Sequence, residues 1–245
     1  ILFISACSIT PEEFDVREKY SVEKNIAYGD ASRQVMDAYY YQDGVENKPI
    51  AIIVHGGAWA AKGVKENMRS RALILANEGF VSFTPDYRQE FMVDQYPTNV
   101  EDIACSIAWA KEHADEYNAD PNNVLLMGYS AGTYSTSMIA FNKGGEDWLK
   151  NCDISTQNLD IVGYVGMSGV GYAIEKPEQV ESEEEFLDTF APGRTIEEIR
   201  SITYVVSTDP RTLLMHGDLD YTAELRHSLD FEEILTENRV INYLY

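Results

Sequence analysis

The chain has 245 residues, 44% of them hydrophobic, and a formal net charge of −22 from 41 acidic and 19 basic residues. This length and apolar content suffice for one domain with a substantial core. The acidic surplus argues against nucleic acid and anionic lipid headgroups as main partners, because phosphate binding needs clustered Lys and Arg. The sequence contains no C-x-x-C or H-E-x-x-H spacing, so we expect neither a metal nor another cofactor.

The chain opens with an apolar run that ends at Cys7. Ile4-Ser5-Ala6-Cys7 resembles the lipobox of a bacterial lipoprotein signal peptide. This resemblance predicts that residues 1–7 are the end of such a signal, that Cys7 carries a lipid, and that the protein is in the cell envelope or secreted. The alternative is an ordinary apolar start and a cytoplasmic protein. The lipid would be the chain's link to a membrane, since the run is too short to span a bilayer.

Residues 8–24 are polar and charged, which predicts a tether before a domain over 25–245. Apolar runs typical of strands then lie at 34–41, 50–54, 80–84, 124–127, 161–165, 212–215 and 240–245. Helical patterns alternate with them at 64–77, 100–111, 131–142 and 221–237. The second of these has a clear start signal, a predicted capping box formed by Thr98 and Glu101. This alternation predicts an α/β fold, with a mostly parallel central sheet covered by helices on both faces.

One acidic stretch, residues 171–204, interrupts the alternation between two predicted strands and contains Glu181, Glu183, Glu184 and Glu185. An insertion there would lie near the carboxyl ends of the strands, where ligands bind in such sheets. Two interpretations stay open: a small cap over the site, and a solvated surface helix.

The three cysteines are too few for a disulfide framework. Cys105 lies in a helical pattern and is predicted as a buried thiol. Pairing with Cys152, which requires an oxidising compartment, is the less favoured alternative.

A serine lies in the sequence Gly128-Tyr129-Ser130-Ala131-Gly132, after a predicted strand and before a predicted helix. G-x-S-x-G in this context is the nucleophile elbow of acyl-transfer enzymes, a turn so tight that its flanking positions must be small. Ser130 is therefore the candidate nucleophile. At a helix N-terminus, the positive end of the helix dipole favours developing negative charge.

A second glycine-containing turn, His55-Gly56-Gly57-Ala58-Trp59, follows the buried strand at 50–54. The oxyanion of acyl transfer needs two or three hydrogen-bond donors about 3 Å away. The backbone N–H groups of Gly57 and Ala58, with that of Ala131 beside the nucleophile, are the candidates. His55 is predicted to be structural, with its ring bonded to the loop backbone, and Trp59 and Tyr129 are the candidate substrate-binding residues.

The last strand-and-loop motif is His216-Gly217-Asp218-Leu219-Asp220, after the run at 212–215. A carboxylate after a late strand is where the acid of a Ser–Asp–His triad order falls. Asp220 is the predicted triad acid, and Asp218 is assigned a helix-capping or turn role.

Together these motifs resemble the carboxylesterases and acetyl- or feruloyl-type esterases of the α/β-hydrolase fold with an H-G-G-x-W oxyanion loop. The likeness runs from about Ala51 to Tyr245 and includes an H-G-x-x-D match that supports Asp220. It implies metal-independent hydrolysis of short acyl esters, carried by a small molecule or linked to carbohydrate. The likeness also covers the residues Asp86-Tyr87-Arg88, Pro97, Asp102 and Asp120-Pro121.

The triad also needs a histidine as general base. The family's histidine follows a further helix and strand, so here it is expected beyond Tyr245, with His227 as a fallback. The other histidines have different expected places: His55 in the oxyanion loop, His113 on a charged helix flank and His216 in the H-G-x-x-D turn. Two alternatives to an ester hydrolase stay open: a formamidase, methylesterase or peptidase of the same fold, and a non-catalytic binding protein of that fold.

Overall fold

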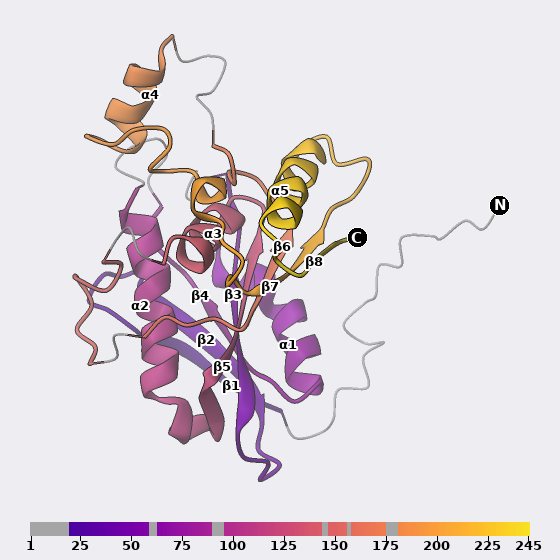
Figure 1. The fold of residues 1–245 in the computed structure, drawn as a ribbon. Coiled ribbons are helices and arrows are strands. Elements are labelled where there is room, and N and C mark those ends of the chain that lie inside the picture. Colours follow the sequence, from indigo (N-terminus) through magenta and orange to yellow (C-terminus); the bar gives the residue numbers. More distant parts are fainter. Residues whose placement is uncertain (1–19, 59–62, 90–95, 144–146, 156–157, 175–180) are drawn as a thin grey trace, which may run out of the picture.

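The computed structural model describes residues 20–58, 63–89, 96–143, 147–155, 158–174 and 181–245 (Figure 1). The predicted signal segment with Cys7, the first part of the predicted tether and Trp59 lie outside these residues.

An eight-stranded sheet with the order β1-β2-β4-β3-β5-β6-β7-β8 forms the centre of the molecule. The pairs β1–β2 and β2–β4 are antiparallel, and the remaining pairs are parallel. The predicted mostly parallel sheet is therefore confirmed. The strands are β1 (Tyr20–Ala27), β2 (Val35–Tyr41), β3 (Lys48–Val54), β4 (Val81–Pro85), β5 (Ala119–Tyr129), β6 (Gly163–Met167), β7 (Arg211–Met215) and β8 (Asn242–Leu244).

The boundary predicted at residue 25 is wrong, because strand β1 begins at Tyr20, inside the predicted tether. Tyr20 pairs with Tyr41 of β2, and Ala27 with Val35. The polar composition of this segment hid the strand. An edge strand pairs on one side only and keeps much of its surface in solvent, so it needs little apolar sequence.

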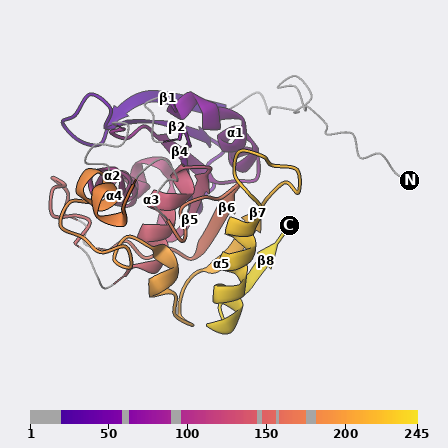
Figure 2. The ribbon, with the colours of Figure 1, turned by 90° about the horizontal axis from the view of Figure 1, so that it is seen from above.

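The helices cover both faces of the sheet, as predicted (Figure 2). Helix α1 packs on one face, whereas α2, α3 and α5 pack on the other. The helical segments are η1 (Lys65–Met68), α1 (Arg69–Asn77), α2 (Thr98–Glu112), η2 (Ala114–Tyr117), α3 (Gly132–Phe141), α4 (Glu183–Phe190), η3 (Ser201–Tyr204) and α5 (Arg226–Glu237). In the described part of the chain, no helix has both the length and the apolar character needed to cross a bilayer.

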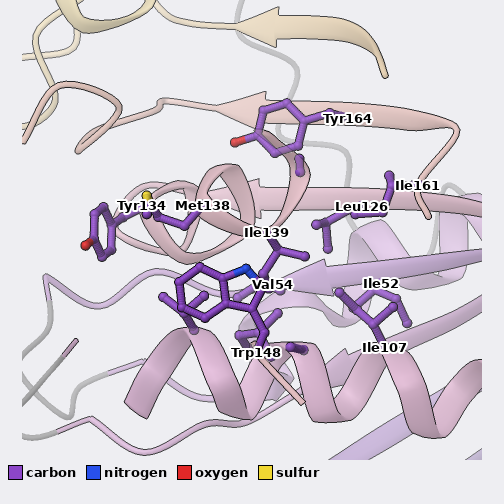
Figure 3. Close-up of a cluster of buried hydrophobic side chains, with 14 of the residues drawn as sticks. Ile52, Val54, Ile107, Leu126, Tyr134, Met138, Ile139, Trp148, Ile161 and Tyr164 are labelled. Carbon is purple, nitrogen blue, oxygen red and sulfur yellow. The ribbon is translucent and has the colours of Figure 1, made fainter. Parts of the chain in front are cut away.

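Strand β3 shows why the sequence produces two layers of core. Ile50, Ile52 and Val54 belong to the large cluster on the α2–α3 face, and Figure 3 shows Ile52 and Val54 close to these helices. Ala51 and Ile53 belong to the cluster under α1. Successive strand residues point to opposite faces, so a run that is apolar throughout fits only a strand buried on both sides.

The capping box predicted at the start of α2 is absent, and this prediction was wrong. Pro97 is the N-cap residue, and no side chain caps the helix. The Glu101 carboxylate instead accepts a hydrogen bond from Asn151 at 2.8 Å and pairs with Lys150 at 3.1 Å. Tertiary partners from a distant loop thus outcompete the local cap.

The same loop brings Cys152 to Cys105, and the two form a disulfide with a Cα–Cα distance of 5.6 Å. The predicted free thiol at Cys105 was therefore wrong. The two cysteines are 47 residues apart in sequence, and only the packing of the loop against α2 brings them together.

The acidic insertion folds around α4, where Ser182 caps the helix by accepting a hydrogen bond from the Glu185 N–H. Its glutamates face solvent, whereas Phe186 and Phe190 are buried. The Phe190 ring packs on Tyr134, in the first turn of α3, with ring centroids 5.6 Å apart. Helix α4 is therefore docked on the helix that follows Ser130, beyond the sheet (Figure 1).

Candidate active site

Ser130 lies in the predicted strand–turn–helix, between the end of β5 at Tyr129 and the start of α3 at Gly132. Its φ of 50° is in the left-handed region, a conformation that costs a non-glycine residue on the order of 1–3 kcal/mol. A Cβ at Gly128 would collide with Thr133 and Thr136, and one at Gly132 would lie 2.5 Å from the His55 carbonyl oxygen. The prediction that both flanking positions must be small is confirmed.

The turn is held in this strained form from two sides. The Ser130 N–H donates to the Met167 carbonyl at the end of β6, at 2.9 Å. The Ser130 carbonyl accepts from both the N–H and the hydroxyl of Thr133, at 2.9 and 2.6 Å. Half-buried Ser130 is thereby fixed at the carboxyl end of the sheet.

The glycine-containing loop after β3 packs directly on this turn. A Cβ built on Gly56 would lie 2.8 Å from the Ser130 Cβ and 3.4 Å from the Ala131 nitrogen. Gly57 and Ala58 have φ values of 142° and 52°. The structure therefore brings the two predicted motifs together, while the roles of the Gly57, Ala58 and Ala131 amides as oxyanion donors stay a prediction.

Asp220 lies in the loop after β7, and its Oδ1 accepts hydrogen bonds from the N–H groups of Thr222 and Ala223, both at 2.9 Å. These two bonds lower the pKa of Asp220 below its ordinary value, and Ser168 and His216 add to the effect. Asp220 thus makes turn contacts of its own and Asp218 is exposed, while the turn role of Asp218 and the triad role of Asp220 stay predictions.

Ser168, at the end of β6, is a site residue that the sequence did not single out. Its φ is 45°, and its N–H donates to the Met215 carbonyl at the end of β7, at 2.8 Å. It directly follows Met167, the acceptor for Ser130, so it lies between the turn at Ser130 and the loop that carries Asp220. The sequence signal that could have identified Ser168 is a small polar residue directly after a predicted parallel strand.

Of the remaining histidines, His113 and His216 have structural contacts. His113 stacks on Trp109 with ring centroids 3.8 Å apart. Both nitrogens of the His216 ring are engaged, Nδ1 with Ser228 Oγ and Nε2 with the Ala223 carbonyl, each at 2.7 Å. His227 lies in the first turn of α5, and its role as a fallback base stays a prediction.

The residue after strand β8, Tyr245, lies beside the start of the loop that carries Asp220. Tyr245 receives a hydrogen bond from the His216 N–H at 2.9 Å and donates its own N–H to the Leu214 carbonyl at 2.8 Å. His216 is four residues before Asp220. Tyr245 is thus hydrogen-bonded to the first residue of the loop that carries Asp220.

His55, at the start of the glycine-containing loop, is fully buried. Its Nδ1 lies 2.6 Å from the Gly56 carbonyl oxygen, which confirms the predicted bond to the loop backbone. Its Nε2 lies 3.1 Å from Asp86 Oδ1, and its ring stacks on Tyr87 with centroids 4.7 Å apart. The Tyr87 hydroxyl donates to the His55 carbonyl at 2.9 Å, so both ends of His55 are fixed.

Asp86 is the hub of this network, and the sequence assigned it no role beyond family resemblance. Its Oδ1 also accepts from the Lys65 N–H at 2.7 Å and from Arg33 at 3.5 Å. Burial alone would raise the Asp86 pKa, but the hydrogen bond and charge of His55, with Lys65 and Arg33, outweigh it and lower the pKa.

The two predicted substrate-binding residues have different outcomes. Trp59 lies outside the described residues. Tyr129 is half-buried, and the Arg71 guanidinium lies 4.9 Å from the centroid of its ring. One face of that ring is thus occupied by α1, and substrate binding by Tyr129 stays a prediction. Across the described ranges, no group of three or more His, Cys, Asp or Glu side chains is placed to hold a metal.

Comparison with known proteins gives a family and a set of relatives. The family model described as BD-FAE matches residues 36–235. Isoprenylcysteine alpha-carbonyl methylesterase ICME of Arabidopsis thaliana is 28% identical over 229 residues, covering 87% of this chain and 52% of that protein. Esterase LipC of Mycobacterium tuberculosis is 25% identical over 228 residues, covering 89% and 56%. The chain spans about half the length of the curated relatives it matches.

Solved structures confirm the predicted α/β-hydrolase fold. A truncated form of a carbohydrate esterase from gut microbiota superimposes with a TM-score of 0.75 at 19% identity, covering 93% of this chain and 88% of that one. The apo form of Thermogutta terrifontis esterase 2 gives 0.74 at 18% identity, covering 93% and 82%.

Proposed function

The chain belongs to the BD-FAE family, and from this premise we propose that it is a carboxylic ester hydrolase with Ser130 as its nucleophile. The observation that carries the proposal is the strained φ of Ser130, 50°, in a turn packed against Gly56 of the glycine-containing loop. Strain of this kind is retained where the surroundings impose it, typically at functional sites. The esterase names of the relatives support the same reaction class.

The proposed reaction has two halves. Ser130 Oγ attacks the acyl carbonyl while a general base takes its proton, and the tetrahedral oxyanion accepts hydrogen bonds from the amides of Gly57, Ala58 and Ala131. The base then protonates the leaving alcohol, leaving an acyl group on Ser130. Water, deprotonated by the same base, attacks this ester, and the acid and the free hydroxyl are released.

We assign Asp220 to orient the base, and we place the base itself on a histidine after Tyr245. The support is geometric: the end of β8 is hydrogen-bonded to His216, at the start of the loop that carries Asp220. The hydrogen bonds that lower the pKa of Asp220 keep it ionised at neutral pH, as this role requires. His227 is the competing assignment.

For the substrate, we propose a short acyl ester, such as an acetyl or feruloyl group linked to carbohydrate. One solved structure with this fold is named as a carbohydrate esterase. A methylesterase is the second candidate, because a relative of 28% identity is an isoprenylcysteine methylesterase by name. Comparing turnover of an acetylated xylo-oligosaccharide, a methyl ferulate and a prenylcysteine methyl ester separates these candidates.

We also propose that the protein is in the cell envelope or secreted, with a lipid on Cys7. The Cys105–Cys152 disulfide supports an oxidising compartment. Labelling with a radioactive fatty acid should mark the wild-type protein and not the Cys7→Ser variant. Equal labelling of both would contradict the proposal.

The reaction is tested with p-nitrophenyl acetate and the full-length protein. Ser130→Ala should lower kcat by at least about 10⁴-fold, because loss of the nucleophile disables the whole triad. Ser155→Ala is the matched control: its exposed hydroxyl bonds to Glu112, which ends α2. Full turnover by Ser130→Ala would disprove the assignment.

A further inference from the structure

Both ring nitrogens of His55 face hydrogen-bond acceptors. Nδ1 lies 2.6 Å from the carbonyl oxygen of Gly56, and Nε2 lies 3.1 Å from the Oδ1 of Asp86. A carbonyl oxygen cannot donate, and an ionised carboxylate can only accept. Each contact is therefore a hydrogen bond only if the nitrogen carries a proton, and a neutral imidazole has one proton for two nitrogens.

The charges around the ring favour the doubly protonated form. Apart from His55, the Asp86 carboxylate accepts hydrogen bonds from the Lys65 N–H at 2.7 Å and from Arg33 at 3.5 Å, and both partners favour its anionic form. Burial raises the pKa of Tyr87, whose ring stacks on His55, so Tyr87 is neutral. The Gln89 amide nitrogen lies 3.4 Å from Nε2, farther than the Asp86 carboxylate oxygen at 3.1 Å, and carries no charge.

The two nearby cations, Lys65 and Arg33, do not neutralise the Asp86 carboxylate that faces the His55 ring. The Lys65 ammonium is bound at 2.7 Å to Asp37, whose side chain is buried. Arg33 reaches Asp86 only at 3.5 Å, while it donates at 2.8 and 2.9 Å to the Tyr87 and Gly63 carbonyls. The shortest charge contact of Asp86 is therefore with His55.

The Gly56 carbonyl that faces His55 belongs to the same peptide unit as the Gly57 N–H. A hydrogen bond from a cation to a carbonyl oxygen draws electron density from the peptide and makes its N–H a stronger donor, which is the cooperativity of hydrogen-bond chains. The peptide lies beside the nucleophile, since Gly56 packs on Ser130.

We propose that His55 is a buried imidazolium, held between Asp86 and the Gly56 carbonyl, that polarises the Gly56–Gly57 peptide and strengthens the Gly57 N–H as an oxyanion donor. This rests on the proposed ester hydrolysis for its catalytic part. His55 does not touch the substrate, so it is a positioning residue that acts through the loop backbone.

The charge state is tested directly by NMR on full-length protein labelled with ¹⁵N-histidine. At pH 8, both ring nitrogens of His55 should show attached protons, assigned as the signals lost in His55→Gln. A single protonated ring nitrogen for His55 at pH 8 would overturn the proposal. This measurement needs no activity, so it separates this proposal from failure of the hydrolase assignment.

The catalytic part is tested by kinetics with p-nitrophenyl acetate. His55→Gln keeps an amide donor without the charge, so kcat should fall by about 10- to 100-fold with KM nearly unchanged, less than the 10²–10³-fold of losing an oxyanion donor. His113→Gln is the matched control, since His113 stacks on Trp109 near the end of α2. Equal kcat values for the two variants would overturn the polarisation.

A pH profile adds a readout that loop collapse would not give. Asp86→Asn replaces the carboxylate that faces His55 Nε2 with a neutral amide. The variant's kcat should then fall at alkaline pH, with a midpoint below that of the wild type. A profile that is uniformly lower but unchanged in shape would contradict the charge assignment.

Discussion

The backbone of Gly56 lies directly against Ser130: a Cβ built on Gly56 would be 2.8 Å from the Ser130 Cβ and 2.7 Å from the Tyr129 carbonyl oxygen. Real Cβ atoms essentially never approach so closely. Two turns that follow different strands, β3 and β5, thus share one van der Waals contact. The missing side chain of Gly56 therefore sets the distance between Ser130 and the glycine-containing loop.

Gly56→Ala should therefore separate the loop from Ser130 while the protein stays folded. We expect kcat on p-nitrophenyl acetate to fall by about 10²-fold or more, because a displacement of about 1 Å in a preorganised site has this cost. Gly217→Ala is the control for folding, since a Cβ there meets nothing within 4 Å. Matching Tm values with unequal kcat would support the contact, and wild-type kcat in Gly56→Ala would refute it.

The acid loop offers a comparison of two neighbouring carboxylates. Asp220 accepts hydrogen bonds from the N–H groups of Thr222 and Ala223, whereas Asp218 is exposed. Asp220→Ala should lower kcat by about 10⁴-fold, the usual cost of losing a triad carboxylate, and Asp218→Ala should lower it less than about threefold. Steady-state kinetics on both variants decide this, and a reversed order would move the acid to Asp218.

The Cys105–Cys152 disulfide should stabilise the fold strongly. It joins residues 47 apart, and loop-closure entropy for such a separation corresponds to about 4 kcal/mol in the free energy of unfolding. The double variant Cys105→Ser/Cys152→Ser should show this loss in urea denaturation. Dithiothreitol should destabilise the wild type and leave the double variant unaffected; equal sensitivity would show that the bond does not form.

The network at Asp86 predicts how stability depends on acid pH. The Asp86 pKa is below its ordinary value of 3.8 in the folded protein. The unfolded chain therefore binds a proton more readily, so the stabilisation is complete above about pH 4 and is lost as the pH falls through the folded pKa. Urea denaturation between pH 6 and pH 3 should show a steeper loss in the wild type than in Asp86→Asn. Parallel curves would exclude Asp86 as a contributor.

Much of this protein follows from local sequence. The apolar runs that became β3 and β4 could be found because a strand buried on both faces tolerates only apolar residues, and the helices because one face must be apolar. Ser130 was identifiable because the turn geometry requires glycine at positions 128 and 132, and such a steric demand is visible within five consecutive positions.

The tertiary structure decided what depends on residues distant in sequence. The Cys105–Cys152 bond, the replacement of a local cap at Glu101 by Lys150 and Asn151, and the Asp86 network each require loops to meet. Local sequence encodes steric and periodic constraints within a few residues, whereas these contacts depend on how whole elements pack. Strand β1 belongs to the same class, since its polar residues are ordered only by the partner strand beside them.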